Sequence, residues 1–293
     1  MSQERIALGT VQFGLDYGIA NSLGRVTLDE STQILDLAKT NGIRTLDTAI
    51  LYGESESILG SYGVSDWDVI TKIPTIPQNI QDIKGWVIDK VECSLKRLNL
   101  TKIYGIMLHD PDQILGYQGK SIFEALNSLK NNNICEKIGL SIYDIAKAEE
   151  YVSAYDIDLV QAPLNIFDRR LIDPAILHIL KSRDIEIHAR SIFLQGLLLL
   201  MRGSVTNRFS HSKQLFDEWY SWLDREDIDP VEACLKFVLQ FKEIDKIVIG
   251  VQDVGQLQNI ISIADKKGFL QFPQWQSEIH SQLINPGLWN RKI

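Results

Sequence analysis

The sequence is poor in cysteine. Its 293 residues include three cysteines, Cys93, Cys135 and Cys234, and no two of them form a C-x-x-C pair. A disulfide framework or a cysteine-rich zinc centre needs more cysteines at closer spacing. We therefore expect three reduced thiols, no metal site and a cytoplasmic protein.

Long apolar runs and an excess of positive charge are also absent. The longest apolar stretch, residues 192–201, is interrupted by Gln195 and Gly196 and is too short to cross a bilayer. The first six residues lack the apolar core of a signal peptide. The formal net charge of −8 is unlike the basic surface of nucleic-acid-binding proteins. These absences predict a soluble protein with neither a membrane nor a nucleic-acid partner.

What the sequence does contain is a regular alternation of short apolar runs with longer amphipathic segments. The runs are rich in Ile, Val and Leu and apolar on both sides, which is typical of strands buried between helices. Eight runs of this kind occur, at residues 6–10, 43–49, 68–73, 103–109, 137–141, 159–163, 185–191 and 246–250.

Helical patterns separate these runs. Thr27 and Glu30 belong to a capping box ahead of an apolar periodicity that ends at Gly42. Further helical patterns cover residues 83–98, 122–129, 145–152, 175–180, 231–241 and 257–263. Eight strand–helix units favour the α/β class and a (β/α)8 TIM barrel, with residues 1–293 as a single domain. An open doubly wound sheet is the alternative, but the G-x-G-x-x-G turn that usually follows its first strand is absent.

Four polar residues stand at or near the ends of successive apolar runs. They are Asp47, Tyr52 in the loop that follows it, Lys72 and His109. Active-site groups of a (β/α)8 barrel stand at the carboxyl ends of its strands. Each residue type also has an ordinary structural role. An aspartate can be a turn residue, a tyrosine a packed ring, a lysine a solvent-exposed amine and a histidine a hydrogen-bonded structural group. Their occurrence together in this order favours a catalytic site.

The segment TLDTAILYG at residues 45–53 resembles the signature of the aldo-keto reductase superfamily. Further motifs are similar to those of this family: VITK at 69–72, LHDPD at 108–112, GTVQFG at 9–14, IGLS at 138–141 and VQAPLN at 160–165. The resemblance runs from about residue 6 to about residue 263. It implies the barrel fold and an NAD(P)H-dependent oxidoreductase that reduces an aldehyde or ketone to an alcohol.

The resemblance also implies a role for each of the four polar residues. Tyr52 would be the general acid that protonates the carbonyl oxygen as hydride reaches the carbon. The ammonium of Lys72, anchored by Asp47, would lower the pKa of the phenol from its usual value of about 10. His109 would donate a hydrogen bond to the substrate oxygen. The implied partner is a small-molecule carbonyl compound, and the implied cofactor is NADPH, with NADH as the alternative.

A set of cofactor-binding residues follows from the same resemblance. Ser141 and Gln161 would bind the nicotinamide carboxamide, although a serine here can also cap a helix and a glutamine can simply lie at the rim. Ile142 stands where the family often has asparagine, which removes one hydrogen bond to the cofactor. The implied set comprises Gly9, Thr10, Asp47, Ser141, Gln161, Arg190, Ser191, Gly250, Gln252 and Gln256.

Arg190 departs from the family pattern. With Ser191 it occupies the segment in which relatives offer an aromatic ring to the nicotinamide. A guanidinium is planar, always charged and rich in hydrogen-bond donors. We expect Arg190 either to lie beside the nicotinamide, where it favours an anionic substrate or a cofactor phosphate, or to pair with a carboxylate at the barrel rim.

The segment at residues 249–257 departs as well. Many relatives bind the adenosine 2′-phosphate with arginine or lysine where this chain has Gln252 and Gln256. Without charge-assisted bonds, and with Asp253 nearby, the preference for NADPH over NADH should be weak. Backbone amides at the start of the next helix could still supply part of an anion site.

The carboxyl-terminal tail, residues 268–293, is rich in aromatic residues: Phe269, Phe272, Trp275 and Trp289. It either covers the pocket or docks on the barrel wall. Two other functions stay open at this point. One is a nicotinamide-binding sensor or scaffold with slow turnover, and the other is an epimerase that recycles a bound cofactor.

Overall fold

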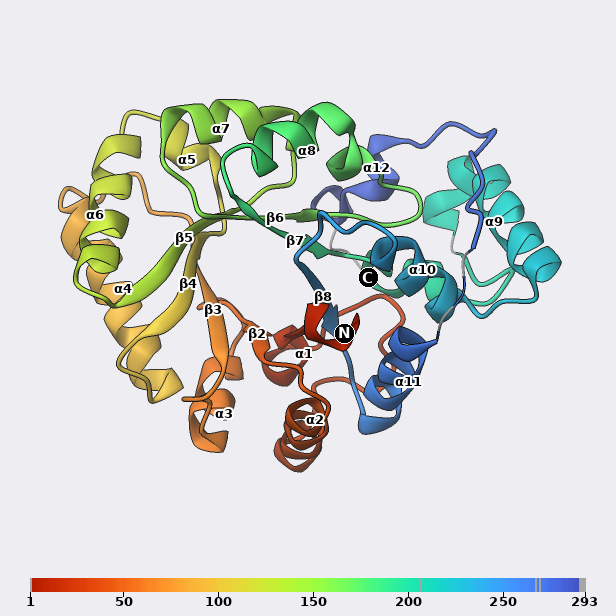
Figure 1. The fold of residues 1–293 in the computed structure, drawn as a ribbon, viewed down its shortest axis with the longest axis horizontal. Coiled ribbons are helices and arrows are strands. Elements are labelled where there is room, and N and C mark those ends of the chain that lie inside the picture. Colours follow the sequence, from red (N-terminus) through yellow and green to blue (C-terminus); the bar gives the residue numbers. More distant parts are fainter. Residues whose placement is uncertain (1, 206, 267, 269, 290–293) are drawn as a thin grey trace.

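The computed structural model describes residues 2–205, 207–266, 268 and 270–289. Within them, eight parallel strands form a closed barrel in which each strand pairs with the next and β8 pairs with β1 (Figure 1). The strands are β1 (Ile6–Gly9), β2 (Thr45–Asp47), β3 (Asp68–Ile73), β4 (Ile103–Leu108), β5 (Cys135–Ser141), β6 (Leu159–Pro163), β7 (Glu186–Arg190) and β8 (Lys246–Gly250). The predicted (β/α)8 barrel is confirmed, and the open sheet is excluded.

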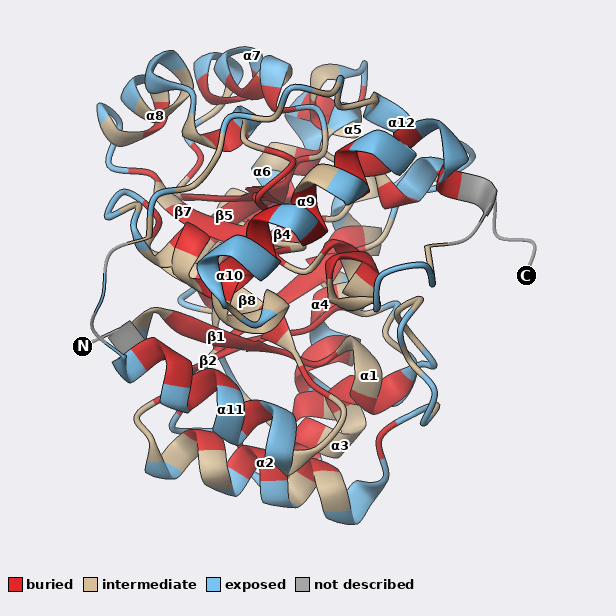
Figure 2. Cartoon of the chain, turned by 90° about the vertical axis from the view of Figure 1, so that its right-hand side faces the viewer, coloured by how far each residue is buried: buried red, intermediate tan, exposed pale blue. Residues whose placement is uncertain are grey.

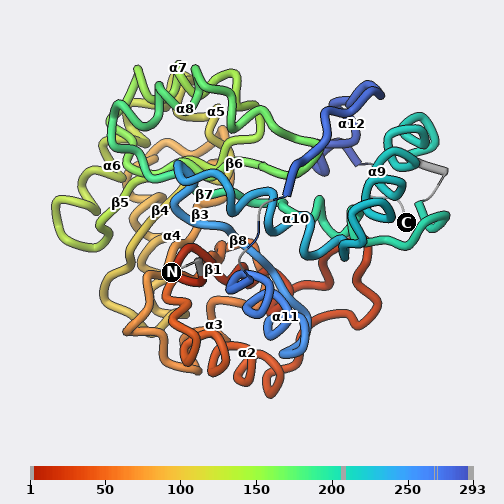
Figure 3. The backbone as a smooth tube through the Cα atoms, turned by 45° about the vertical axis from the view of Figure 1, so that its right-hand side comes forward, coloured from red at the N-terminus to blue at the C-terminus, as the bar shows by residue number. Residues whose placement is uncertain are grey.

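Helices follow the strands and surround the barrel. They are α1 (Val11–Gly14), α2 (Leu28–Thr40), α3 (Ser55–Tyr62), α4 (Ile83–Leu98), α5 (Asp112–Leu115), α6 (Gly119–Asn131), α7 (Ala148–Ala154), α8 (Pro174–Lys181), α9 (Lys213–Glu226), α10 (Pro230–Leu239), α11 (Val254–Asp265) and α12 (Ser281–Ile284). Half of the predicted capping box is present: the side chain of Thr27 accepts a hydrogen bond from the amide of Glu30, but the Glu30 carboxylate accepts from the amide of Val254 instead of that of Thr27. In Figure 3, α9 lies at the right-hand side of the molecule, outside the ring of the other helices.

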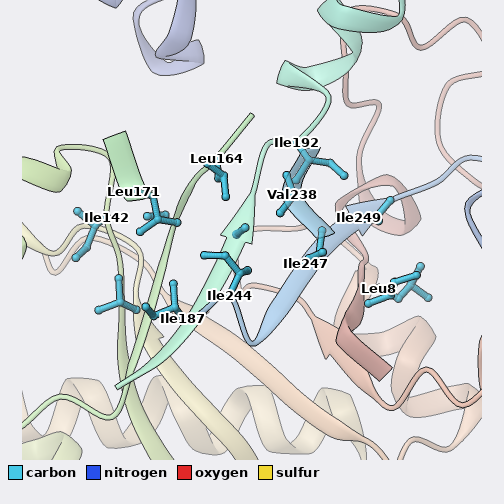
Figure 4. Close-up of a cluster of buried hydrophobic side chains, with 14 of the residues drawn as sticks. Leu8, Ile142, Leu164, Leu171, Ile187, Ile192, Val238, Ile244, Ile247 and Ile249 are labelled. Atoms are coloured by element: carbon cyan, nitrogen blue, oxygen red, sulfur yellow. The ribbon is translucent and has the colours of Figure 1, made fainter. Parts of the chain in front are cut away.

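Apolar packing holds the helices to the barrel. The buried residues form a continuous core between strands and helices, and Figure 2 shows them on the strands and on the inner faces of the helices. Figure 4 shows part of this core, with Ile187 of β7, Ile247 of β8 and Val238 of α10 among its members. A smaller cluster of Ile70, Met107 and Leu159 comes from three different strands. Ile70 shares its face of β3 with Lys72, because side chains two residues apart point the same way. We therefore place this cluster inside the barrel.

The amino end of the barrel carries a polar network centred on Glu186, the first residue of β7. Its carboxylate accepts a hydrogen bond from the hydroxyl of Tyr104 at 2.6 Å and pairs with Lys137, and it lies 2.6 Å from Nε2 of His188. Burial opposes ionisation of Glu186, but the bonds from His188, Lys137 and Tyr104 outweigh it and hold its pKa well below the usual range. This end is therefore filled by ionic and hydrogen-bonded groups, and the opposite end is left for a pocket.

Two further features of the described residues concern the cysteines and the length of the helices. Cys93, Cys135 and Cys234 are free. Across the described ranges, no helix has both the length and the apolar character needed to span a bilayer. Phe269 and residues 290–293 of the predicted tail lie outside the described residues.

Candidate active site

A pocket of about 1120 Å³ opens at the carboxyl ends of the barrel strands. Its wall includes every residue proposed from the sequence for catalysis or cofactor binding: Gly9, Thr10, Asp47, Tyr52, Lys72, His109, Ser141, Gln161, Arg190, Ser191, Gly250, Gln252 and Gln256. Closure of the barrel brings them together, because the carboxyl ends of all parallel strands face the same side. Among the described residues, no group of three or more His, Cys, Asp or Glu side chains is arranged to hold a metal ion.

Asp47 and Lys72 form a buried ion pair in this pocket. The ammonium of Lys72 lies 2.7 Å and 2.6 Å from the two carboxylate oxygens of Asp47 and donates to the backbone carbonyl of Thr48 at 3.0 Å. The Lys72 side chain is 1% exposed and that of Asp47 5%. Burial lowers the pKa of Lys72, and the Asp47 carboxylate opposes that shift. Lys72 is therefore a solvent-excluded cation held by one carboxylate.

Gln161 extends this pair across the barrel. Its amide nitrogen donates to Oδ1 of Asp47 at 2.7 Å, although β6 and β2 are not neighbours in the sheet. The amide oxygen of Gln161 is buried and has no hydrogen-bond partner. A buried acceptor without a donor is costly, so it indicates a place for a donor group. Gln161 is buried and lines the pocket.

Tyr52 is positioned by a close backbone contact between two loops. The backbone of Gly14 lies so near that a Cβ there would come within 1.7 Å of the carbonyl oxygen of Tyr52. Gly53 has a φ of +54°, and a Cβ on it would lie 2.5 Å from the carbonyl oxygen of Gly14. Only glycine avoids both clashes. The ring centroid of Tyr52 then lies 5.3 Å from the ammonium nitrogen of Lys72. It lies 6.2 Å from the ring centroid of His109, and the planes of these two rings meet at 81°.

The electrostatic surroundings of Tyr52 differ from the expectation. Burial and the Asp47 carboxylate raise the pKa of the Tyr52 phenol, and only Arg190 acts clearly in the opposite direction. The predicted net lowering of this pKa is wrong for this structure, because burial and the Asp47 carboxylate outweigh the opposing effect of Arg190. The phenol therefore stays protonated throughout the neutral range.

His109 is a neutral imidazole in this setting. Burial and the cations Lys72 and Arg190 lower the pKa of His109 to about 4, with Asp47 acting against them. Its Nδ1 is buried without a hydrogen-bond partner. A neutral ring carries one N–H and can donate one hydrogen bond to an oxygen in the pocket.

Arg190 stacks on Tyr143 instead of pairing with a carboxylate. Its guanidinium carbon lies 3.8 Å from the ring centroid of Tyr143. Its terminal nitrogens donate to Oγ of Ser191 and to the carbonyl of Ile142, each at 3.3 Å, and its Nε is buried without a partner. Within the described part of the chain Arg190 joins no ion pair, so the rim-carboxylate alternative is wrong.

Tyr143 was not anticipated from the sequence. It comes from the loop after β5 and Arg190 from the end of β7, so only the fold brings them together. The loop after Arg190 is strained as well, since Ser191, Leu194 and Gln195 have φ values of 59°, 49° and 54°. Left-handed backbone at non-glycine residues clusters at functional sites.

Thr10 and Ser141, two of the predicted cofactor contacts, lie in different surroundings. The hydroxyl of Thr10 is fully buried, donating to the carbonyl of Asp47 at 3.0 Å and bonded to Ser55. Ser141 ends β5 beside Gln161, and the N-cap of the next helical turn is Asp144. The reading of Ser141 as a helix cap is therefore wrong.

The start of α11 already carries carboxylates. Oδ1 of Asp253 accepts from the amide of Gln256 at 2.7 Å, and Oε1 of Glu30 accepts from the amide of Val254 at 2.7 Å. The side chain of Gln256 in turn accepts from the amide of Gln252 at 3.0 Å. Protein oxygens occupy the amides of Gln252, Val254 and Gln256 in this structure, so an anion could bind these three only by replacing those contacts.

The tail reaches the pocket and also packs on the wall. Pro286, Gly287 and Trp289 line the pocket. Nε1 of Trp275 donates to the carbonyl of Ile166 at 2.9 Å, in the loop after β6. In the described residues the tail therefore both lines the pocket and packs on the barrel wall.

Sequence and structure comparisons identify related proteins. The chain matches the Aldo/keto reductase family over residues 5–270. It is 24% identical over 207 residues to oxidoreductase sirO of Leptosphaeria maculans, a match that covers 66% of this chain and 61% of the relative. It is 25% identical over 174 residues to glyoxal reductase of Bacillus subtilis, covering 58% and 61%. The matched segments thus span about three fifths of the length of these relatives.

Solved structures share the fold. The holo form of an aldo-keto reductase from Bacillus halodurans superposes with a TM-score of 0.70 at 20% identity, covering 91% of this chain and 88% of that one. The glycerol dehydrogenase of Gluconobacter oxydans superposes with a TM-score of 0.67 at 20% identity, covering 88% and 86%. The family match over residues 5–270 and the closed eight-stranded barrel lead to the same conclusion: the chain belongs to the aldo/keto reductase family.

Proposed function

We propose that this protein is an NAD(P)H-dependent oxidoreductase that reduces an aldehyde or ketone to an alcohol, with Tyr52 as the proton donor. The observation that carries the proposal is the convergence of the Tyr52 phenol, the Asp47–Lys72 pair and the His109 imidazole in one pocket. The names of the relatives, an oxidoreductase and a glyoxal reductase, agree with this chemistry.

The pocket residues fit a nicotinamide cofactor. The unpartnered amide oxygen of Gln161 can accept a hydrogen bond from the carboxamide of nicotinamide, with Ser141 beside it. Gly9 and Gly250 lie side by side at the ends of β1 and β8 and leave the pocket wall without side chains there. The family default is NADPH, and NADH is the alternative. When bound, the cofactor supplies the hydride.

Each polar residue then has a defined task. The protonated phenol of Tyr52 donates its proton to the carbonyl oxygen as negative charge develops there. The neutral imidazole of His109 donates a hydrogen bond to the same oxygen and orients it. Lys72, fixed by Asp47, keeps a positive charge beside the Tyr52 ring and favours the phenolate that forms when the proton leaves.

We extend the proposal to the organisation of the chain. Residues 1–293 are one domain, and the tail after Gly268 covers part of the pocket, in keeping with the contacts of Pro286 and Trp289. The three free thiols suit a cytoplasmic location.

The test is turnover of a panel of aldehydes with NADPH and with NADH, followed by cofactor absorbance. Wild-type protein should consume cofactor and form the alcohol, and Tyr52→Phe should lower kcat by roughly a hundredfold or more with the fold intact by circular dichroism. Equal rates for the two proteins would refute Tyr52 as the donor. Cofactor binding without turnover would favour the sensor, and product formation without cofactor consumption would favour the epimerase.

A further inference from the structure

We infer that Arg190 binds an anionic group of the substrate, so that the preferred substrates are carbonyl compounds carrying a carboxylate or a phosphate. This inference rests on the proposed reduction. It concerns the part of the substrate that does not react.

The charges of the pocket leave Arg190 uncompensated. Lys72 and Asp47 neutralise each other at 2.6 Å. Asp16 is exposed and accepts a hydrogen bond from Nδ2 of Asn21 at 3.0 Å. In the described ranges no carboxylate pairs with Arg190, which is only partly exposed. A partly desolvated cation without a counter-ion is unfavourable, so an anion that enters the pocket gains by meeting it.

The geometry of Arg190 suits an anion. Stacking on Tyr143 at 3.8 Å fixes the guanidinium plane and leaves its N–H groups directed outward at the edge of that plane. Its present acceptors, Oγ of Ser191 and the carbonyl of Ile142, are neutral and lie at 3.3 Å, longer than a typical N–H···O bond. Charge-assisted bonds to carboxylate or phosphate are shorter and stronger. An anion can therefore replace these contacts with a net gain.

Arg190 also lies close to the reacting groups. It lines the same pocket as Tyr52 and His109, and its charge acts toward a lower pKa for both. A single small molecule can therefore present its carbonyl to Tyr52 and His109 and an anionic group to Arg190. The exposed apolar residues Leu15 and Leu51 line the same pocket and leave room for an apolar body.

The experiment compares matched pairs of aldehydes that differ in charge. One pair is 4-carboxybenzaldehyde and 4-formylbenzamide, and the other is glyceraldehyde 3-phosphate and glyceraldehyde. For at least one pair, wild-type kcat/KM should favour the anion by roughly tenfold to a hundredfold. The pair that shows the larger ratio distinguishes carboxylate from phosphate. Arg190→Gln should bring the ratio close to one, and Arg190→Lys should retain part of it.

The ratio is formed within each variant, so changes in folding or cofactor affinity cancel. The matched control is Arg183→Gln, which removes an exposed arginine ahead of the amino end of β7, opposite the pocket, and should leave the ratio unchanged. Wild-type ratios near one for both pairs, or an unchanged ratio in Arg190→Gln, would overturn the inference. Weaker cofactor binding by Arg190→Gln with an unchanged ratio would assign Arg190 to a cofactor phosphate.

Binding of the corresponding alcohols keeps this test separate from the proposed function. Calorimetry with 4-(hydroxymethyl)benzoate and 4-(hydroxymethyl)benzamide reports the anion site without turnover. If wild type reduces none of the aldehydes but binds the acid more tightly than the amide, and Arg190→Gln loses that difference, the anion site stands and the reductase proposal fails. Equal binding of acid and amide by wild type would refute the anion site.

Discussion

Lys72 and Arg190 are two cations of one pocket with opposite environments. Lys72 is almost fully buried and bonded to both oxygens of Asp47, whereas Arg190 rests on an aromatic ring and keeps donors free. The carboxylate of Asp47 fixes the position of the Lys72 ammonium, whereas the Arg190 guanidinium has no carboxylate partner among the described residues. The two residues therefore respond differently to substitution.

Removal of the Asp47 carboxylate should destabilise the protein. Asp47→Asn leaves the Lys72 ammonium buried without a counter-ion, which typically costs about 3–5 kcal/mol. Urea unfolding at neutral pH measures the loss. The control is Asp66→Asn, because Asp66 pairs with Lys39 at 3.7 Å with side-chain exposures of 72% and 43%. Exposed pairs contribute about 0–1 kcal/mol.

The pH dependence of this effect provides a second check. In Asp47→Asn the pKa of Lys72 should fall further below the usual lysine value of about 10.4, since burial and Arg190 lower it and the opposing Asp47 carboxylate is gone. The unfolded chain then binds the proton more tightly than the folded one, so the variant gains stability as pH rises toward that value. A variant as stable as Asp66→Asn at every pH would contradict this account of the pair.

The pH profile of the reduction should lack an alkaline limb in the neutral range. A proton donor works below its pKa, and burial raises the pKa of Tyr52. His109, with a pKa lowered to about 4, stays neutral above that value. We expect kcat/KM for an uncharged aldehyde to be constant from about pH 6 to about pH 9 and to fall only toward pH 4. Loss of activity with an apparent pKa near 7 would indicate a different donor.

The four polar residues of the site could be predicted because they end neighbouring strands or follow them. Tyr143 could not, since its contact with Arg190 depends on two loops that are distant in sequence. The net shift of the Tyr52 pKa was predicted with the wrong sign, because burial and the Asp47 carboxylate raise it. A sequence shows that an amine and a phenol share a pocket, but the carboxylate bonded to the amine decides how much of its charge the phenol feels.

At the scale of elements, the junction of α2 and α11 bears on cofactor choice. The family resemblance assigns the adenosine 2′-phosphate to the segment around Gln252 and Gln256, and the pocket extends to both residues. Carboxylates of Glu30 and Asp253 occupy the first amides of α11. An additional phosphate would meet negative charge there.

We therefore expect wild-type kcat/KM for NADPH to exceed that for NADH by no more than about tenfold. Gln252→Arg should raise the NADPH-to-NADH ratio by roughly tenfold, because it adds a charge-assisted donor. Gln240→Arg, at the exposed end of α10, adds the same charge away from the pocket and should leave the ratio unaltered. A hundredfold preference of the wild type for NADPH would contradict this reading of α11.

Element boundaries varied in how well the sequence predicted them. The helix at residues 83–98 and the strands at 68–73, 159–163 and 246–250 have the predicted bounds. Helix α9 was missed, although Leu215, Trp219 and Trp222 recur on its buried face. It is an extra helix between β7 and α10, so the strand–helix alternation gave no reason to expect one there.

For the whole molecule, the two ends of the barrel have different tasks. Glu186 at the amino end is bonded by Tyr104, Lys137 and His188, and the pocket occupies the carboxyl end. Glu186→Gln should lower stability by about 1–3 kcal/mol at neutral pH and leave kcat/KM unaffected. Urea unfolding and steady-state kinetics on the same preparation measure both.

The sign of the pH effect follows from the lowered pKa of Glu186. Its contribution to stability is present above the unfolded glutamate pKa of about 4.3 and is lost as pH falls below it. Wild type and Glu186→Gln should therefore converge in acid. Glu136→Gln, at an exposed position on β5, is the matched control. A change in kinetics caused by Glu186→Gln would show that the two ends are coupled.

The α/β class could be read from eight apolar runs, whereas only the number of units and the absence of a G-x-G-x-x-G turn favoured a closed barrel over an open sheet. Periodicity describes each strand and its helix separately, and an open sheet has the same pattern. The pairing of β1 with β8 decides between them, and it joins the first strand to the last.

That pairing sets an order of events during synthesis. As the chain leaves the ribosome, β1 meets β2 early, but its other edge has no neighbour until Lys246–Gly250 has emerged. Bringing such distant segments together is slow, and the unpaired edge can meanwhile attract other chains. Gly9 and Gly250 come side by side only when β1 pairs with β8, so a nascent chain that already contains Tyr52 and Lys72 still has an incomplete pocket wall.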